Sequence, residues 1–262
     1  MQRVIFVNCQ SSDSVTQFSR WGRLENGSLP LPLEMQMKTI ASYFLAFLAS
    51  LLIFVGLPLL GWGIRDLPRF FDHPARSLYI MAIFILQLLA VLYNPQVGRR
   101  PEHRKSGVPQ HKIDLLLIQI FSLAIVFLAP FSDGHSFAAL NISGMGRYAG
   151  LILMIPGFLL MQAAEKHLDK QFSIQVTLQE DHKLIQSGPY KYIRHPRYLG
   201  ILLFFLGISL TFQSLTGMLL ILALTLVFVW RIYTEEALLQ QEFGKEWEAY
   251  RNQSWRMFPF IF

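Results

Sequence analysis

The chain has 262 residues, of which 53% are hydrophobic and only 15% are charged. Soluble domains carry about 25% charged residues, so the composition excludes an ordinary soluble protein and indicates an integral membrane protein. The single cysteine excludes an internal disulfide framework, and no Cys or His cluster predicts a metal site. The net charge of +6 fits the basic flanks of membrane spans better than nucleic-acid binding, because the cations form no single stripe.

Residues 1–34 are polar and lack the apolar core of a signal peptide, so we expect a disordered N-terminal segment there. Four apolar runs follow, each close to the length of about 20 residues that a membrane-crossing helix needs. They lie at 39–60, 78–93, 113–131 and 147–163. The clearest polar residues within the spans are Gln87, Gln119 and Gln213, which carry no charge, and this disfavours a transporter.

The last apolar run, 198–230, is too long for one ordinary span. The sequence "TFQSLTG" at 211–217 interrupts it with polar residues and a glycine, which favours a turn. We therefore predict a helical hairpin with arms at 196–212 and 215–231.

The distribution of Lys and Arg supports this hairpin. With six spans, 19 of these residues lie on one side of the membrane and 3 on the other, whereas a single span over 198–230 would give 15 and 7. Cytoplasmic loops carry the excess of Lys and Arg, so both termini are expected in the cytoplasm. The expected fold is all-α, a polytopic membrane helical bundle of about six spans.

Polar residues gather in "GPYKYIRHPRYLG" at 188–200, just before the hairpin. His195 precedes a proline and should be extended, and Pro196 suits the first turn of a helix. The free N–H groups of that turn, beside Arg194 and Arg197, can hold an anionic group. An aromatic and basic belt at the membrane interface explains the same residues equally well.

A second polar group follows the hairpin, on the same expected cytoplasmic face. Arg231 and Glu235 are four residues apart and should meet on one face of a helix. Glu236 is adjacent to Glu235, so we expect only one of the two to face inward. A helix-end ion pair without function would also account for this pattern.

Taken together, the two segments resemble the isoprenylcysteine carboxyl methyltransferase family and its phospholipid methyltransferase relatives. The resemblance lies in "FSIQVTLQEDHKLIQSGPYKYIRHPRYLG" at 172–200, an apolar hairpin, and "RIYTEEALLQQEFGKEWEAY" at 231–250. It covers roughly the last ninety residues, and the earlier spans match only as generic membrane helices. It implies a methyltransferase core at 164–262, preceded by variable membrane helices at 35–163 that set the choice of methyl acceptor.

The resemblance also implies a cytoplasmic site for S-adenosylmethionine. Glu235 stands at the cofactor-binding glutamate of the family and Arg231 at an arginine assigned to the substrate; these two are the candidate catalytic residues. The other candidate cofactor contacts are Gln175, His182, Lys183, Leu184, Ile185, Tyr190, His195, Pro196, Arg197 and Tyr198. Arg197 departs from the family, where many members have a small serine.

The chemistry of the acceptor favours a carboxylate. A carboxylate needs no general base and can be gripped by the Arg231 fork, whereas an amine would have to lose a proton. We therefore expect O-methylation of a prenylated or otherwise lipophilic acceptor that enters from the bilayer lipids. A phospholipid-amine N-methyltransferase remains an alternative, as does a sterol-type membrane reductase that uses NADPH. The adjacent glutamates and the spacing to the hairpin favour the methyltransferase.

Overall fold

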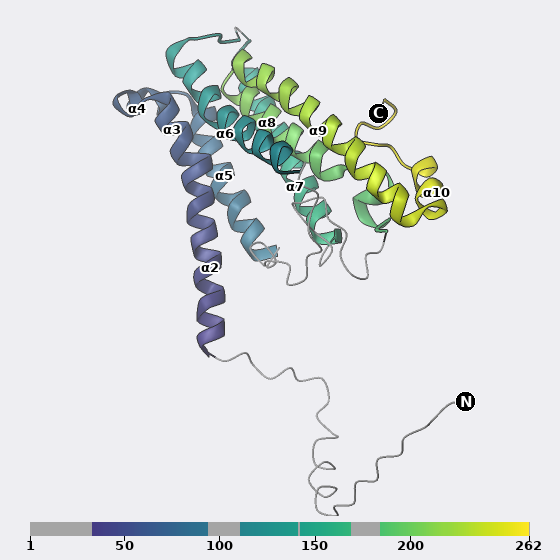
Figure 1. Ribbon diagram of the computed structural model, residues 1–262. Coiled ribbons are helices and arrows are strands. Elements are labelled where there is room, and N and C mark those ends of the chain that lie inside the picture. The colour runs from purple at the N-terminus through teal and green to yellow at the C-terminus, as the bar shows by residue number, and fades with distance from the viewer. Residues whose placement is uncertain (1–32, 94–110, 141, 169–183, 262) are drawn as a thin grey trace, which may run out of the picture. The chain divides into compact units, whose positions relative to one another are not determined.

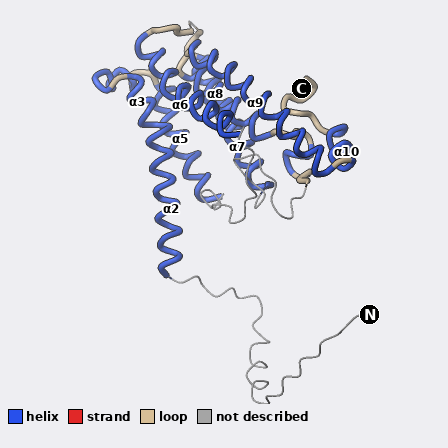
Figure 2. The backbone as a smooth tube through the Cα atoms, viewed as in Figure 1, coloured by secondary structure: helices blue, strands red, loops and turns tan. Residues whose placement is uncertain are grey.

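The computed structural model describes residues 33–93, 111–140, 142–168 and 184–261. The chain divides into two compact units, residues 1–40 and 41–262. The first unit contributes only the opening turns of one helix to the described residues, and the segment 1–32, predicted to be disordered, lies outside them. All regular structure in the described ranges is helical apart from two isolated β-bridges, which confirms the all-α prediction (Figures 1 and 2).

The described helices follow one another along the chain in this order. The first is α2 (Leu33–Leu51), which continues through a π-helical turn, η1 (Leu52–Gly56), into α3 (Leu57–Trp62). The remaining elements are η2 (Ile64–Asp66), α4 (Leu67–Phe71), α5 (Pro74–Tyr93), α6 (His111–His135), α7 (Met145–Leu168), η4 (Gly188–Lys191), α8 (Pro196–Thr211), α9 (Leu215–Phe243) and α10 (Lys245–Gln253).

Five helices in the described part of the chain are long and apolar enough to cross a membrane. They are Ala41–Trp62, Pro74–Leu92, Ile113–His135, Met145–Leu168 and Leu215–Phe243, and α8 is a shorter apolar helix. Each coincides with one of the six expected segments to within a few residues, except at the end of α9. The protein is therefore a multi-pass membrane protein, while the number of helices that cross the bilayer stays a prediction.

The turn between α8 and α9 lies where the polar interruption predicted it. Gln213 takes a left-handed conformation, with φ of 47°, and its side-chain amide donates to the carbonyl of Ile142 at 2.7 Å. Ser214 caps α9 by accepting a hydrogen bond from the Gly217 N–H at 2.9 Å. The second arm does not end at 231, because good helix formers follow until Gly244, whose φ of +48° ends the helix.

Helices α7 and α8 run antiparallel in unusually close contact. Gly150 and Gly157 of α7 face Gly207 and Gly200 of α8, and the spacing is seven residues on both helices. A Cβ atom at Gly157 would lie 2.6 Å from the Phe204 nitrogen, and one at Gly200 would lie 2.7 Å from the Gly157 oxygen. Small residues that let backbones approach are typical of helix packing in membranes. This contact fixes the first turn of α8 against α7.

A buried charge cluster lies where α6, α7 and α8 meet at the turn end of the hairpin. Arg147 grips Asp133 with both terminal nitrogens, at 2.6 Å each, and also donates to the Thr211 carbonyl at 2.9 Å. Arg76 of α5 donates to the same carboxylate at 3.0 Å. Arg147, the first residue of the predicted span 147–163, is therefore a buried charge, in contrast to the uncharged interior expected from the glutamines. Asp133 is the shared counterion of both arginines, and we assign this cluster to holding the helix ends together.

We predict that Gly157→Ala lowers stability by about 1–3 kcal/mol, because the added methyl group meets backbone atoms that cannot rotate away. Thermal unfolding of the purified protein in detergent measures the change. Gly56→Ala is the matched control, since its added Cβ would meet only the flexible end of the Leu52 side chain, at 3.1 Å. Equal unfolding temperatures for the two variants would contradict the proposed role of the close contact.

Candidate active site

Residues 184–195, the segment before α8, are held in place by contacts with α7 and with the C-terminal tail. Gly188 has a φ of +59° and packs so closely on the His167 ring that a Cβ would lie 2.3 Å from it. Further along, the Trp255 N–H donates to the Tyr192 carbonyl at 2.9 Å, and the Arg194 N–H donates to the Trp255 carbonyl at 2.8 Å. The C-terminal tail thus pairs with residues 192–195 as a short parallel bridge.

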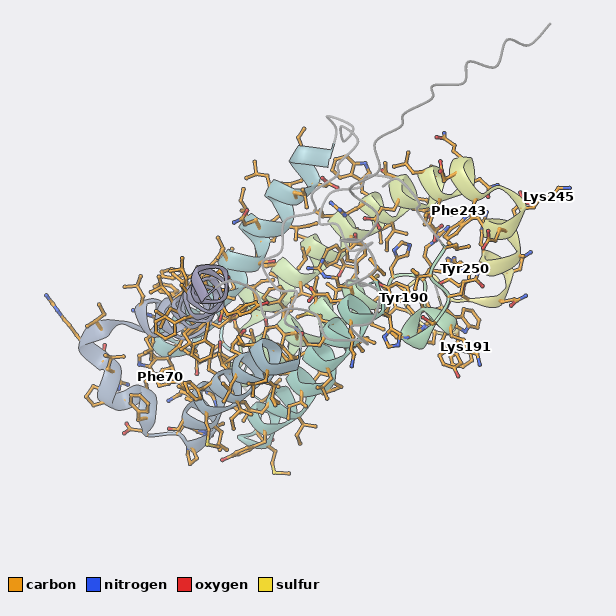
Figure 3. The ribbon with its side chains drawn as sticks, turned by 90° about the horizontal axis from the view of Figure 1, so that it is seen from below. Phe70, Tyr190, Lys191, Phe243, Lys245 and Tyr250 are labelled. Atoms are coloured by element: carbon orange, nitrogen blue, oxygen red, sulfur yellow. The ribbon has the colours of Figure 1, made fainter. Side chains whose placement is uncertain are left out.

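Helix α10 adds a third support to this segment. The Tyr250 hydroxyl donates to the Tyr190 carbonyl at 2.7 Å, and the two tyrosines lie close together in Figure 3, at the end of the helices away from Phe70. Burial raises the pKa of the Tyr250 phenol to about 12 and raises that of Tyr190 as well. Both phenols therefore stay protonated at neutral pH and act as packing and hydrogen-bonding groups.

His195 is the N-cap residue of α8, and Pro196 begins the helix as predicted. The His195 backbone has φ −123° and ψ 57°, so the expected extended conformation is wrong. The reason is tertiary: the His195 N–H donates to the Arg256 carbonyl at 3.0 Å, and this fixes the residue against the tail. The imidazole is buried, with 7% of the side chain exposed.

Both glutamates that follow the hairpin reach this imidazole. Glu235 Oε2 lies 3.4 Å from His195 Nδ1, and Glu236 Oε1 lies 3.4 Å from His195 Nε2. The expectation that only one of them faces inward is therefore wrong. Adjacent helical residues point in different directions, but two long side chains can converge on a group that lies between those directions. His195 occupies that place.

The two carboxylates govern the charge of His195. Burial lowers its pKa, but the hydrogen-bonding and charge interactions with Glu235 and Glu236 outweigh burial and raise the pKa above the ordinary value. Within the described part of the chain, Nε2 makes no well-aligned hydrogen bond, and its contact with Glu236 Oε1 at 3.4 Å is an ion pair. His195 is thus a buried group that favours the protonated state, and its Nε2–H can donate to a ligand or a water molecule.

Arg231 is the most enclosed charge of the site. Its Nε donates to the Tyr198 hydroxyl oxygen at 2.8 Å and to Glu235 Oε1 at 2.9 Å, which confirms the predicted pair four residues apart on one helix face. Its Nη1 donates to Asp114 Oδ2 of α6 at 2.8 Å. The sequence interpretation missed Asp114, although a single carboxylate in the apolar run "IDLLLIQIF" is a signal for it.

The other arginines of the segment pair with carboxylates. Arg194 Nε and Arg256 Nε each donate to Glu236 at 3.0 Å, so Glu236 ties residue 194 to the tail. Arg197 Nε donates to Glu165 of α7 at 3.1 Å. This pair gives Arg197, the residue that departs from the family pattern, a partner that a serine would lack. The sequence interpretation named neither Glu165 nor Arg256.

Aromatic rings form one wall beside the charges. The Tyr198 ring stacks on Phe228 of α9 with centroids 4.6 Å apart and lies parallel to the His195 ring at 5.7 Å. The Tyr198 hydroxyl also donates to Glu235 Oε1. The structure therefore brings together five of the candidate residues: His195, Pro196, Tyr198, Arg231 and Glu235.

Other candidate residues are placed less closely or fall outside the description. Leu184 and Ile185 are half-buried at the start of the segment. Gln175, His182 and Lys183 lie outside the described residues. Across the described ranges, no group of His, Cys, Asp and Glu side chains could hold a metal ion.

Known proteins resemble this chain over a range that includes α7, α8 and α9. The sequence profile of the phospholipid methyltransferase family matches residues 145–246. A probable protein-S-isoprenylcysteine O-methyltransferase from Oryza sativa subsp. indica is 32% identical over 156 residues, which cover 56% of this chain and 80% of the relative. The chain belongs to the protein-S-isoprenylcysteine O-methyltransferase family.

A second relative matches over most of the chain. The enzyme of that name from Saccharomyces cerevisiae is 27% identical over 229 residues, which cover 85% of this chain and 90% of the relative. The structure of the eukaryotic intramembrane Ras methyltransferase ICMT aligns with 87% of this chain and 85% of its own at 20% identity and a TM-score of 0.49.

We predict that His195 makes stability depend on pH. Because its folded pKa is raised, its contribution is complete below about pH 6.5 and is lost as the pH rises through the folded pKa. The difference in unfolding temperature between the wild type and His195→Gln should therefore shrink from about pH 6 to about pH 9.

His73→Gln provides the control for this titration. Burial and the nearby Arg147 and Arg76 lower the pKa of His73, so neutral His73 is favoured and its contribution should decline as the pH falls instead. A His195 difference that stays constant over the same pH range would rule out a protonated His195 between the two glutamates.

Proposed function

We propose that this chain is an integral membrane methyltransferase that transfers a methyl group from S-adenosylmethionine to the carboxylate of an isoprenylcysteine-like, lipophilic acceptor. The family supports the reaction and the acceptor class. The observation that carries the assignment to residues is Arg231, a buried guanidinium in an apolar helix, in direct contact with Glu235 and Tyr198. Its surroundings combine a fork for a carboxylate with acidic and aromatic groups for a cationic cofactor.

The described residues fit the chemistry of S-adenosylmethionine. Its sulfonium and ammonium are cations, which suit Glu235 and the Tyr198 ring, and its carboxylate suits the N-terminus of α8. The buried His195 Nε2, which has an ion pair with Glu236 at 3.4 Å but no well-aligned hydrogen bond in the described part of the chain, is a polar atom that a ligand could satisfy. Tyr190 would line the same site. When bound, the cofactor supplies an electrophilic methyl group.

The protein's own task is then to orient and desolvate the reactants. Arg231 would fix the acceptor carboxylate, which is already nucleophilic and needs no proton removed. Tyr198 and Glu235 would hold the cofactor beside it. The apolar faces of the surrounding helices suit a lipophilic chain that reaches Arg231 from the bilayer.

An acceptor amine on a phospholipid is the second candidate, and the match of residues 145–246 to the phospholipid methyltransferase family is the observation that favours it. An amine must lose a proton, and each carboxylate among Glu235, Glu236 and Asp114 is engaged by an arginine. We therefore place O-methylation first. We further propose that the site and both termini lie in the cytoplasm, on the basis of the Lys and Arg distribution.

Glu235→Gln and His195→Ala should each abolish binding of S-adenosylmethionine while leaving expression largely intact. The first substitution removes a negative charge that attracts the positively charged cofactor. The second removes the imidazole that holds Glu235 and Glu236 together. Isothermal titration of purified protein measures the affinity. Glu242→Gln, an exposed glutamate on the same helix, is the matched control and should bind as the wild type does.

The same titration with NADPH tests the reductase alternative. Binding of NADPH without binding of S-adenosylmethionine by the wild type would overturn the proposed function. If Glu235→Gln and His195→Ala both keep the wild-type affinity for S-adenosylmethionine, the cofactor binds elsewhere than at this site.

A further inference from the structure

The pair of Asp114 and Arg231 joins two helices that are distant in the sequence. Asp114 lies in the first turn of α6, and Arg231 lies within α9. The two side chains are 4% and 3% exposed, and the distance from Oδ2 to Nη1 is 2.8 Å. Asp114 also precedes residues 145–246, the range that matches the methyltransferase family. This contact therefore links the cofactor-site residues to a helix outside the matched range.

Arg231 contacts two carboxylates that differ in their surroundings. Glu235 is 19% exposed and also touches His195 and Tyr198, whereas Asp114 is almost completely enclosed. Glu235 is therefore the carboxylate that a bound ligand can reach. Asp114 is the one that stays with the guanidinium.

A buried guanidinium cannot lose its counterion cheaply. Removing one partner of a buried ion pair is strongly destabilising, because it leaves an uncompensated charge in a medium of low polarity. If Glu235 were the sole counterion, turning it toward a cofactor would strand Arg231. With Asp114 in place, Glu235 can change partner while Arg231 stays neutralised and oriented.

We propose that Asp114 is a positioning residue, a dedicated counterion of Arg231 that releases Glu235 to bind the cofactor. The proposal rests on the proposed function, in which Glu235 contacts S-adenosylmethionine. It assigns to α6 a defined role in the site: this helix sets the charge and the orientation of the arginine that receives the acceptor.

Isothermal titration with S-adenosylmethionine tests this proposal without turnover. Asp114→Asn should weaken cofactor binding by about tenfold or more, because Arg231 then holds Glu235 as its remaining carboxylate partner among these contacts. Arg231→Gln should bind within about threefold of the wild type, since Glu235 is no longer held. The double variant should bind like Arg231→Gln alone. If Asp114 had only a structural role, removing Arg231 would not restore the cofactor affinity that Asp114→Asn loses.

Two further variants keep the test sharp. Asp114→Glu retains the charge and should bind within about threefold of the wild type. Asp133→Asn breaks a buried pair of the same type at the other charge cluster, and it should lower the unfolding temperature without changing cofactor affinity. If Asp114→Asn does not fold, the cofactor affinities of the double variant and of Arg231→Gln test the proposal instead. The double variant should fold, because replacing a buried ion pair with a neutral pair costs little stability.

Three outcomes are separable. Absence of cofactor binding by the wild type would refute the proposed function itself. Binding by the wild type and equally by Asp114→Asn would refute only the role of Asp114. A double variant that binds more weakly than Arg231→Gln would also refute it, since Asp114 would then act independently of the arginine.

Discussion

The site depends on the burial of one arginine. Arg231 lies in an apolar helix with 3% of its side chain exposed, and a guanidinium in such surroundings must be neutralised and hydrogen-bonded. Its contacts with Asp114, Tyr198 and Glu235 come from α6, α8 and α9. The need to compensate this charge therefore ties three helices together at the point where the chemistry is proposed, and it gives the tyrosine and the glutamate fixed positions.

A second constraint fixes the other side of the same site. Glu236 binds Arg194 before α8 and Arg256 in the tail, while His195 lies between Glu236 and Glu235. The close approach of α7 and α8 at their glycines holds the first turn of α8 in the bundle. The C-terminal tail is consequently part of the site's framework, although none of its residues was a candidate for binding.

The sequence predicted those features that depend on local pattern. Apolar length located the six helices, the polar interruption located the turn at Gln213, and a spacing of four residues paired Arg231 with Glu235. Long-range partners could not be predicted in this way, because the lone carboxylate in an apolar run marks Asp114 as unusual but nothing local identifies Arg231 as its partner. The inward position of Glu236 was missed for a related reason. It follows from where His195 lies, which is a tertiary property.

In the proposed reaction, Arg231 holds the carboxylate of a lipophilic acceptor, and this acceptor carboxylate receives the methyl group. Transfer of the labelled methyl group from S-adenosylmethionine tests it most directly, with a farnesylcysteine analogue and native membrane lipids as competing acceptors. We predict base-labile label on the farnesylcysteine analogue, as expected of a methyl ester. In Arg231→Lys, which cannot present a fork to the carboxylate, the amount of label transferred should fall by about a hundredfold or more. Label found on phospholipid amines alone, or transfer to the analogue that is unchanged in Arg231→Lys, would contradict it.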